Sequence, residues 1–157
     1  MEKINSLTGM TDLIETKADE NVLANKVFQT EKILKEIFTN YAMSEIRTPA
    51  LENTNLFKRS VGDTSDIVNK ELYTFSDKND KSITLRPEGT ASVMRSIIEK
   101  KLDGETHKLW YLGPMWRYER PQKGRYRQFN QAGIEILGYP EGAPEFEMIS
   151  LICELNR

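Results

Sequence analysis

The sequence predicts an α+β domain in which an antiparallel sheet is flanked by helices. Three observations lead to this prediction. Apolar residues recur at helical spacing near both ends, at residues 21–41 and 144–155, and short strand-like segments lie between them. Turn-forming polar residues separate consecutive strands, as they do in hairpins. Strands that follow one another without a crossover helix favour antiparallel pairing, which places the chain in the α+β class.

Composition limits the classes of protein to which this chain can belong. Its 157 residues fit one domain, and 38% are hydrophobic, which is enough for a core. The net charge of -2 excludes a generally basic nucleic-acid-binding surface but permits a local basic patch. One cysteine and one histidine exclude an internal disulfide and disfavour a Cys/His metal site, so no metal ligands are predicted. Without a signal peptide or a long apolar run, we expect no membrane contact and a cytoplasmic location.

The first predicted elements are a helix, a strand and a helical turn. Residues 21–41 predict a helix with one apolar face, because their apolar residues recur at three-, four- and seven-residue steps. Residues 44–48 suit a short strand, and Pro49 must end it or lie at a sheet edge. Residues 53–59 favour a short helical turn.

A hairpin and a second helix follow. Residues 73–75 and 82–85 have strand character, and the polar run between them predicts a turn. Residues 89–101 predict a helix that buries Val93, Ile97 and Ile98.

The second half of the chain predicts a longer hairpin and a final helix. Strand-like residues 109–112 lead into an alternation of apolar and charged residues at 115–119, and strand character returns at 128–137. The polar, basic residues 120–127 between them predict the tip of an antiparallel hairpin. Pro144 suits the first turn of a helix at 144–155, which is expected to bury four apolar residues, namely Met148, Ile149, Ile152 and Leu155.

The strand at 128–137 carries an unusual set of polar side chains. Alternation places Asn130, Ala132, Ile134 and Ile136 on a mostly apolar face, which suits the core. The opposite face carries an amide, a carboxylate, a ring at the loop end and a glycine that leaves space above the sheet, and it consists of Phe129, Gln131, Gly133 and Glu135. Such a face has the composition of a floor for a small ligand.

The hairpin also concentrates positive charge. Residues 117–127 hold five basic residues against one acid, a local charge of +4 in a chain that is negative overall, and the five are Arg117, Arg120, Lys123, Arg125 and Arg127. A charge run alone is more typical of a solvated loop. Next to the polar floor, however, clustered guanidinium groups favour a polyphosphate site, because their forks match phosphate oxygens.

A third candidate segment lies between a strand and a helix, at Thr84-Leu85-Arg86-Pro87-Glu88-Gly89-Thr90. Backbone amides at a helix start favour anions, whereas the carboxylate of Glu88 and the hydroxyl of Thr90 suit an ammonium group. The alternative is structural: a helix cap followed by an acid in the first turn.

These segments resemble class II aminoacyl-tRNA synthetases. The motif 2 pattern of that class matches Trp116-Arg117-Tyr118-Glu119 and Arg125-Tyr126-Arg127-Gln128-Phe129. Residues 56–59, 85–90 and 120–129 resemble the histidyl-tRNA synthetase family in particular, and residues 45–52 around Pro49 resemble motif 1, which builds the dimer interface of the class. The resemblance implies that residues 1–157 form the N-terminal portion of a class II catalytic domain. Motif 3 and an anticodon-binding domain are expected to lie beyond Arg157.

The resemblance also implies a role for each candidate residue. Arg117 is the expected catalytic residue, which binds the α-phosphate of ATP and the amino-acid carboxylate. The ATP site is implied at Arg117, Glu119, Arg125 and Phe129. Histidine is expected to contact Glu88, Gly89, Thr90, Arg117, Gln131 and Glu135. The acceptor end of tRNA(His) is expected to contact Arg120, Gln122 and Lys123.

The implied function is that of a histidine–tRNA ligase, which activates L-histidine with ATP and Mg²⁺ and transfers it to tRNA(His), as a homodimer. The chain departs from the family pattern near its start, where Thr8-Gly9 stands in place of the usual Arg-Gly. One alternative is a synthetase-like regulatory subunit of histidine biosynthesis, which the intact segment Lys123-Gly124-Arg125 disfavours. Another is an RNA-binding module without enzymatic activity, which the low overall charge disfavours.

Overall fold

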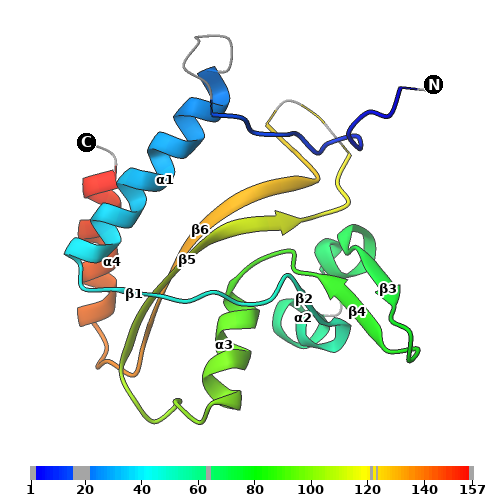
Figure 1. The fold of residues 1–157 in the computed structure, drawn as a ribbon. Helices are drawn as coiled ribbons and strands as arrows, with labels where there is room; N and C mark the ends of the chain where they lie inside the picture. The colour runs from blue at the N-terminus through cyan, green and yellow to red at the C-terminus, as the bar shows by residue number, and fades with distance from the viewer. Residues whose placement is uncertain (1–2, 16–21, 63–64, 121, 123, 156–157) are drawn as a thin grey trace. The chain divides into compact units, whose positions relative to one another are not determined.

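The computed structural model describes residues 3–15, 22–62, 65–120, 122 and 124–155. Its helices and strands confirm the α+β class (Figure 1). In chain order they are α1 (Val22–Asn40), β1 (Ser44–Glu45), β2 (Leu51–Asn53), α2 (Thr54–Val61), the π-helical turn η2 (Ile67–Glu71), β3 (Thr74–Ser76), β4 (Ser82–Leu85), α3 (Thr90–Glu99), β5 (His107–Trp116), β6 (Gln128–Leu137) and α4 (Ala143–Leu155).

The described strands form two three-stranded sheets, with the orders β2-β4-β3 and β1-β5-β6. In the first sheet both pairs are antiparallel, so the predicted hairpin of β3 and β4 is confirmed. In the second sheet β6 runs back beside β5 (Figure 1), but β1 pairs with β5 in parallel. The prediction of a wholly antiparallel sheet is wrong at this pair. The long connection between β1 and β5 acts as the crossover that parallel strands require.

The chain forms two compact units. The first comprises Met1–Asp12, Arg47–Lys100 and Gly113–Gln131, and the second comprises Leu13–Ile46, Lys101–Leu112 and Ala132–Arg157. Both β5 and β6 therefore contribute residues to each unit.

The first unit contains the β2-β4-β3 sheet with α2 and α3. The hydroxyl of Thr84, which is fully buried, forms hydrogen bonds of 2.8 Å with Thr54 and 3.0 Å with Thr74. The core includes the predicted Val93 and Ile97, but Ile98 is 62% exposed, contrary to the prediction. Each helical residue turns by about 100°, so the residue after Ile97 leaves the buried face.

The second unit packs around Phe38, Met43, Trp110 and Leu151. The rings of Phe38 and Trp110 lie 5.2 Å apart between centroids, within the range of favourable aromatic pairs. These contacts fix α1 and α4 within the unit.

The helix α4 was predicted correctly in extent, but its buried face was not. The four apolar residues expected inside, Met148, Ile149, Ile152 and Leu155, are all exposed. Leu151 is buried instead, and one turn earlier Glu147 accepts an ion pair of 2.7 Å from Lys108. The inner face thus contains a paired charge, which hydrophobic spacing alone does not reveal.

We expect the ion pair between Glu52 and Arg95 to stabilise the first unit. The Glu52 side chain is only 7% exposed, and its Oε1 lies 2.7 Å from Nη2 of Arg95. The hydrogen bond that Arg95 donates to Glu52 is the main cause that raises the pKa of Arg95 above its ordinary value, against the effect of burial. Replacing Glu52 by alanine leaves the partly buried charge of Arg95 without this partner. The free energy of unfolding should therefore fall by about 2 kcal/mol.

Chemical denaturation measures this loss, and Glu99→Ala is the matched control. Glu99 also pairs with Arg95, at 2.6 Å, but its side chain is 68% exposed. Its removal should change the free energy of unfolding by less than about 0.5 kcal/mol. Equal losses for the two variants would contradict the importance of burial at Glu52.

Candidate functional site

The long hairpin places two arginines and an acid around one pocket. β5 ends at Trp116, so Arg117 and Glu119 follow the strand instead of continuing it as predicted. The amide of Arg117 still donates to the carbonyl of Arg127 in the other arm, at 3.0 Å, whereas that of Tyr118 donates to the carbonyl of Glu71, at 2.7 Å. The predicted tip at 120–127 lies between β5 and β6, where a bridge joins Gln122 to Arg125.

The pocket at the hairpin has a volume of about 460 Å³. All four residues expected to bind ATP line it, together with three others, and the full set is Glu71, Arg117, Glu119, Gly124, Arg125, Tyr126 and Phe129. The two arms of the hairpin bring these residues together. A ring, two guanidinium groups and a carboxylate therefore border one space.

The charges in this pocket are loosely paired. Oε1 of Glu119 lies 4.0 Å from Nη1 of Arg117, and Oε2 lies 3.5 Å from Nη1 of Arg125. The guanidinium of Arg117 lies 5.2 Å from the ring centre of Phe129, and its Nε donates to the carbonyl of Pro87 at 3.0 Å. Contacts as long as those with Glu119 are weak, so both arginines keep donors for a polyanion.

The segment before α3 adopts the structural alternative that the sequence left open. Oε2 of Glu88 accepts from the amide of Thr90 at 2.7 Å, and Oε1 accepts from the amide of Ala91 at 3.0 Å. The carboxylate therefore caps α3. The next residue, Gly89, donates its amide to Oε1 of Gln131 at 3.1 Å, which joins this segment to β6.

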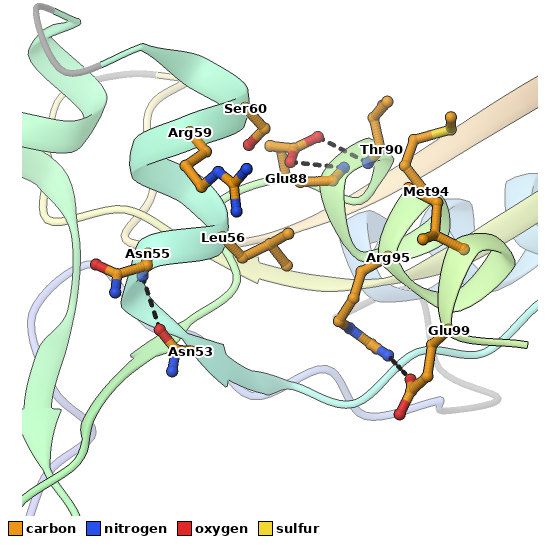
Figure 2. A pocket seen from close by; sticks show the side chains of 12 residues that line it. Asn53, Asn55, Leu56, Arg59, Ser60, Glu88, Thr90, Met94, Arg95 and Glu99 are labelled. Carbon is orange, nitrogen blue, oxygen red and sulfur yellow. Dashed lines mark hydrogen bonds and ion pairs between the residues drawn. The ribbon is translucent and has the colours of Figure 1, made fainter.

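A second pocket, of about 1050 Å³, lies in the first unit between α2 and α3 (Figure 2). Figure 2 shows Leu56 from α2 and Met94 from α3 among its lining, with the capping bonds of Glu88 at one end. Glu88 and Thr90 line this pocket, whereas Arg117 lines the hairpin pocket. The residues expected to bind histidine thus do not all line one of the two pockets described.

The glycine of the predicted floor does not leave an open gap. A Cβ added to Gly133 would lie 2.2 Å from Cζ and 2.3 Å from the hydroxyl oxygen of Tyr111. The Tyr111 ring therefore fills the space that the sequence assigned to a ligand, which corrects that prediction. Glu135 lies half-buried on β6 and belongs to the second unit.

The residues expected to contact tRNA lie in the loop. Arg120 and Gln122 are exposed, and Lys123 lies outside the described residues. Within the described ranges, no cluster of three or more His, Cys, Asp or Glu residues could hold a metal ion. In the same ranges, no helix has the length and apolar character to cross a membrane.

Sequence reasoning singled out Gly9 only as part of a departure from the family pattern, and it did not predict that this residue positions the hairpin. The carbonyl of Gly9 accepts from the amides of Arg127, at 2.8 Å, and Gln128, at 3.2 Å. Arg127 in turn lies 4.1 Å over the Tyr118 ring and donates to the carbonyl of Glu119 at 3.1 Å. This N-terminal contact uses the backbone carbonyl of Gly9. The unusual Thr8-Gly9 pair was the available signal.

Replacing Gly9 by alanine should loosen the hairpin. Its φ of +79° favours glycine, and an added Cβ would lie 3.0 Å from Cγ and 3.1 Å from the backbone nitrogen of Arg127. We expect a loss of about 1–2 kcal/mol in the free energy of unfolding, measured by denaturation. Gly142→Ala is the control, since Gly142 has a φ of +92° with no atom within 4 Å. An equal loss in both variants would mean that strain alone, and not the contact with Arg127, accounts for the effect.

Comparisons with known proteins agree on one family. The family model described as Histidyl-tRNA synthetase matches residues 20–157. The chain is 56% identical over 127 residues to the histidine–tRNA ligase of Desulfitobacterium hafniense, and 54% identical over 125 residues to that of Geobacter sulfurreducens. These matches cover 80% and 78% of the chain but 30% of each relative. The chain therefore spans about a third of the length of these relatives.

Two solved structures share the fold. The apo histidyl-tRNA synthetase of S. aureus matches with a TM-score of 0.77 and 39% identity, over 98% of this chain and 34% of that one. A protein of Bacillus halodurans described as an ATP phosphoribosyltransferase regulatory subunit/histidyl-tRNA synthetase matches with a TM-score of 0.71, over 99% of this chain and 38% of that one. At 23% identity, this second match shows the fold alone.

Proposed function

The chain belongs to the histidyl-tRNA synthetase family, and we propose that the protein containing it is a histidine–tRNA ligase. This ligase activates L-histidine with ATP to histidyl-adenylate and then transfers the histidyl group to the 3′ end of tRNA(His). The observation that carries the proposal is the hairpin pocket, where Arg117, Glu119, Arg125 and Phe129 surround one space.

Each residue of the hairpin pocket has a role in the proposed site. Arg117 binds the α-phosphate and the histidine carboxylate, so that it neutralises charge where the two substrates meet. Arg125, which is 63% exposed, binds the γ-phosphate, and Phe129 stacks on adenine beside Glu119. When polyphosphate binds, it replaces the long contacts to Glu119, and Mg²⁺ arrives with ATP as part of the substrate.

The proposed histidine site uses the start of α3 and one face of β6. Glu88, Thr90 and Gln131 bind the amino group, Gly89 lies between the first two, and Glu135 accepts a hydrogen bond from the imidazole. The cap on α3 is compatible with this role, because two carboxylate oxygens offer about four acceptor positions and the two amides occupy only part of them.

The proposed reaction relies on position and charge. The histidine carboxylate attacks the α-phosphorus of ATP in line, a bond to the α-phosphorus forms, and pyrophosphate leaves. A ribose hydroxyl at the 3′ end of tRNA then attacks the acyl carbon and AMP leaves. Fixed guanidinium groups stabilise the charge that develops on the phosphates without reorganising in the reaction.

Further properties belong to the proposed ligase as a whole. Arg120, Gln122 and Lys123 contact the acceptor end of tRNA(His), and the segment around Pro49 pairs with its symmetry mate in a cytoplasmic homodimer. The 127 matched residues cover 30% of the relative, and this chain alone is proposed to bind ATP or histidine weakly and to lack useful aminoacylation activity.

Charging of tRNA(His) with labelled histidine tests both parts of the proposal. The full protein should charge the tRNA, and the 157-residue chain should not. A full protein that fails to charge tRNA(His) while binding histidine would favour a regulatory role. A short chain that charges at a similar rate would contradict the proposed inactivity of the isolated segment.

A further inference from the structure

The side chain of Tyr111 covers Gly133 on the neighbouring strand. An added Cβ at Gly133 would lie 2.2, 2.3 and 2.7 Å from Cζ, the hydroxyl oxygen and Cε1 of Tyr111. Real side-chain atoms do not approach so closely, so the phenol end of the ring can occupy this place only because position 133 has no side chain. Tyr111 is 7% exposed, so its ring is a fixed part of the second unit.

The ring lies on the side of β6 toward which the Glu135 side chain projects. A Cβ at position 133 and the Cβ of Glu135 point to the same face, because they are two residues apart on a strand. That separation is about 7 Å along the strand. The phenol end of Tyr111 therefore lies on the same face of β6 from which the Glu135 side chain projects, and both residues belong to the second unit.

We propose that Tyr111 is a specificity-determining residue of the amino-acid site, a rigid wall against which the substrate side chain lies. This inference rests on the proposed function, in which Glu135 binds the imidazole. A flat aromatic ring held next to the carboxylate favours a flat substrate ring through edge or offset contacts. It also limits the room for a substrate side chain, so that larger side chains meet the phenol while small aliphatic ones make neither the ring contact nor the hydrogen bond to Glu135.

The opposing reading makes Tyr111 a packing residue that only supports β6. The two readings differ in which substrate responds to a change. A wall of the amino-acid site affects the KM for histidine and leaves the KM for ATP almost unchanged. A general packing defect lowers the thermal stability and changes both constants together.

The test uses the full protein with the variants Tyr111→Leu, Tyr111→Phe and Gly133→Ala, assayed by histidine-dependent ATP–pyrophosphate exchange. Tyr111→Leu removes the ring, and Gly133→Ala displaces it. Each should raise the KM for histidine about tenfold, with the KM for ATP within about twofold. Tyr111→Phe keeps the wall and should stay near the wild-type value.

A double-variant cycle tests whether loss of the Tyr111 ring from its place is the cause of the rise in the KM for histidine. If Gly133→Ala acts by displacing Tyr111, it should have little further effect in a Tyr111→Leu background, where the clashing atoms are gone. Full additivity of the two changes, or equal rises in the KM for histidine and ATP, would overturn the proposal. Should Gly133→Ala fail to fold, Tyr111→Leu decides alone, because it adds no atoms. A wild-type protein without histidine-dependent exchange would instead refute the proposed function, and this inference with it.

Discussion

Replacing Arg117 by alanine should lower the rate of histidine-dependent ATP–pyrophosphate exchange about a hundredfold or more. The guanidinium of Arg117 donates a hydrogen bond of 3.0 Å to the carbonyl of Pro87 and lies 5.2 Å from the ring centre of Phe129. Removal of one preorganised group that stabilises charge in a transition state commonly costs this much in rate. The measurement is steady-state exchange at saturating ATP and histidine, with the full protein.

The control for this prediction is Arg120→Ala. It removes the same charge from an exposed position in the loop, outside the residues that line the hairpin pocket. Exchange should remain within a fewfold of the wild-type rate, since it requires no tRNA, whereas charging of tRNA(His) should fall. Equal losses of exchange in both variants would indicate that the hairpin contributes only its overall charge.

Replacing Glu135 by glutamine should weaken histidine binding strongly and leave ATP binding almost unchanged. The substitution keeps the size of the side chain but removes the charge that accepts the imidazole N–H in the proposed site. Loss of a hydrogen bond to a charged group costs about 1.5–3 kcal/mol, which corresponds to a rise in KM of about 10- to 150-fold. The KM for histidine, measured beside the KM for ATP, checks this result.

Glu154→Gln is the matched control for Glu135. Glu154 is an exposed acid on α4, so its replacement removes the same charge from the same unit without touching β6. Its KM for histidine should equal that of the wild type. An unaltered affinity for histidine in Glu135→Gln would show that Glu135 has a structural role in β6 instead of a role in recognition.

Local sequence patterns were sufficient to predict the elements that carry the hairpin site. The residues Arg117, Glu119, Arg125 and Phe129 lie near one another because a single hairpin joins them, and hairpins follow from strand and turn signals close in sequence. The helix at Val22–Asn40 was equally clear, since its apolar period extends over many residues.

Contacts between segments far apart in the chain could not be predicted from local sequence patterns. Gly9 meets Arg127 across more than a hundred residues, and no local pattern encodes that pairing. The parallel partner of β1 depends on a long connection in the same way. Gly133 did give a signal, but a glycine in a strand indicates either an open space or a close neighbour, and here the neighbour is Tyr111.

The sequence patterns also failed to predict which helix residues are buried and which are exposed to solvent. The apolar residues of α4 fit a buried stripe by spacing, yet Glu147 faces inward because Lys108 neutralises it. Glu88 shows the same difficulty at the site itself. A carboxylate at the start of a helix serves as a cap or as a ligand group, and here it caps α3.

The most direct measurement of the central claim is ATP–pyrophosphate exchange by the full protein with each of the twenty amino acids in turn. The hairpin pocket and the face of β6 are proposed to join ATP to histidine, so exchange should occur with histidine and stay near background with the others. Arg117→Ala should reduce the histidine-dependent signal to background. Exchange that depends on a different amino acid, or that is absent with histidine and unaffected by Arg117→Ala, would contradict the account.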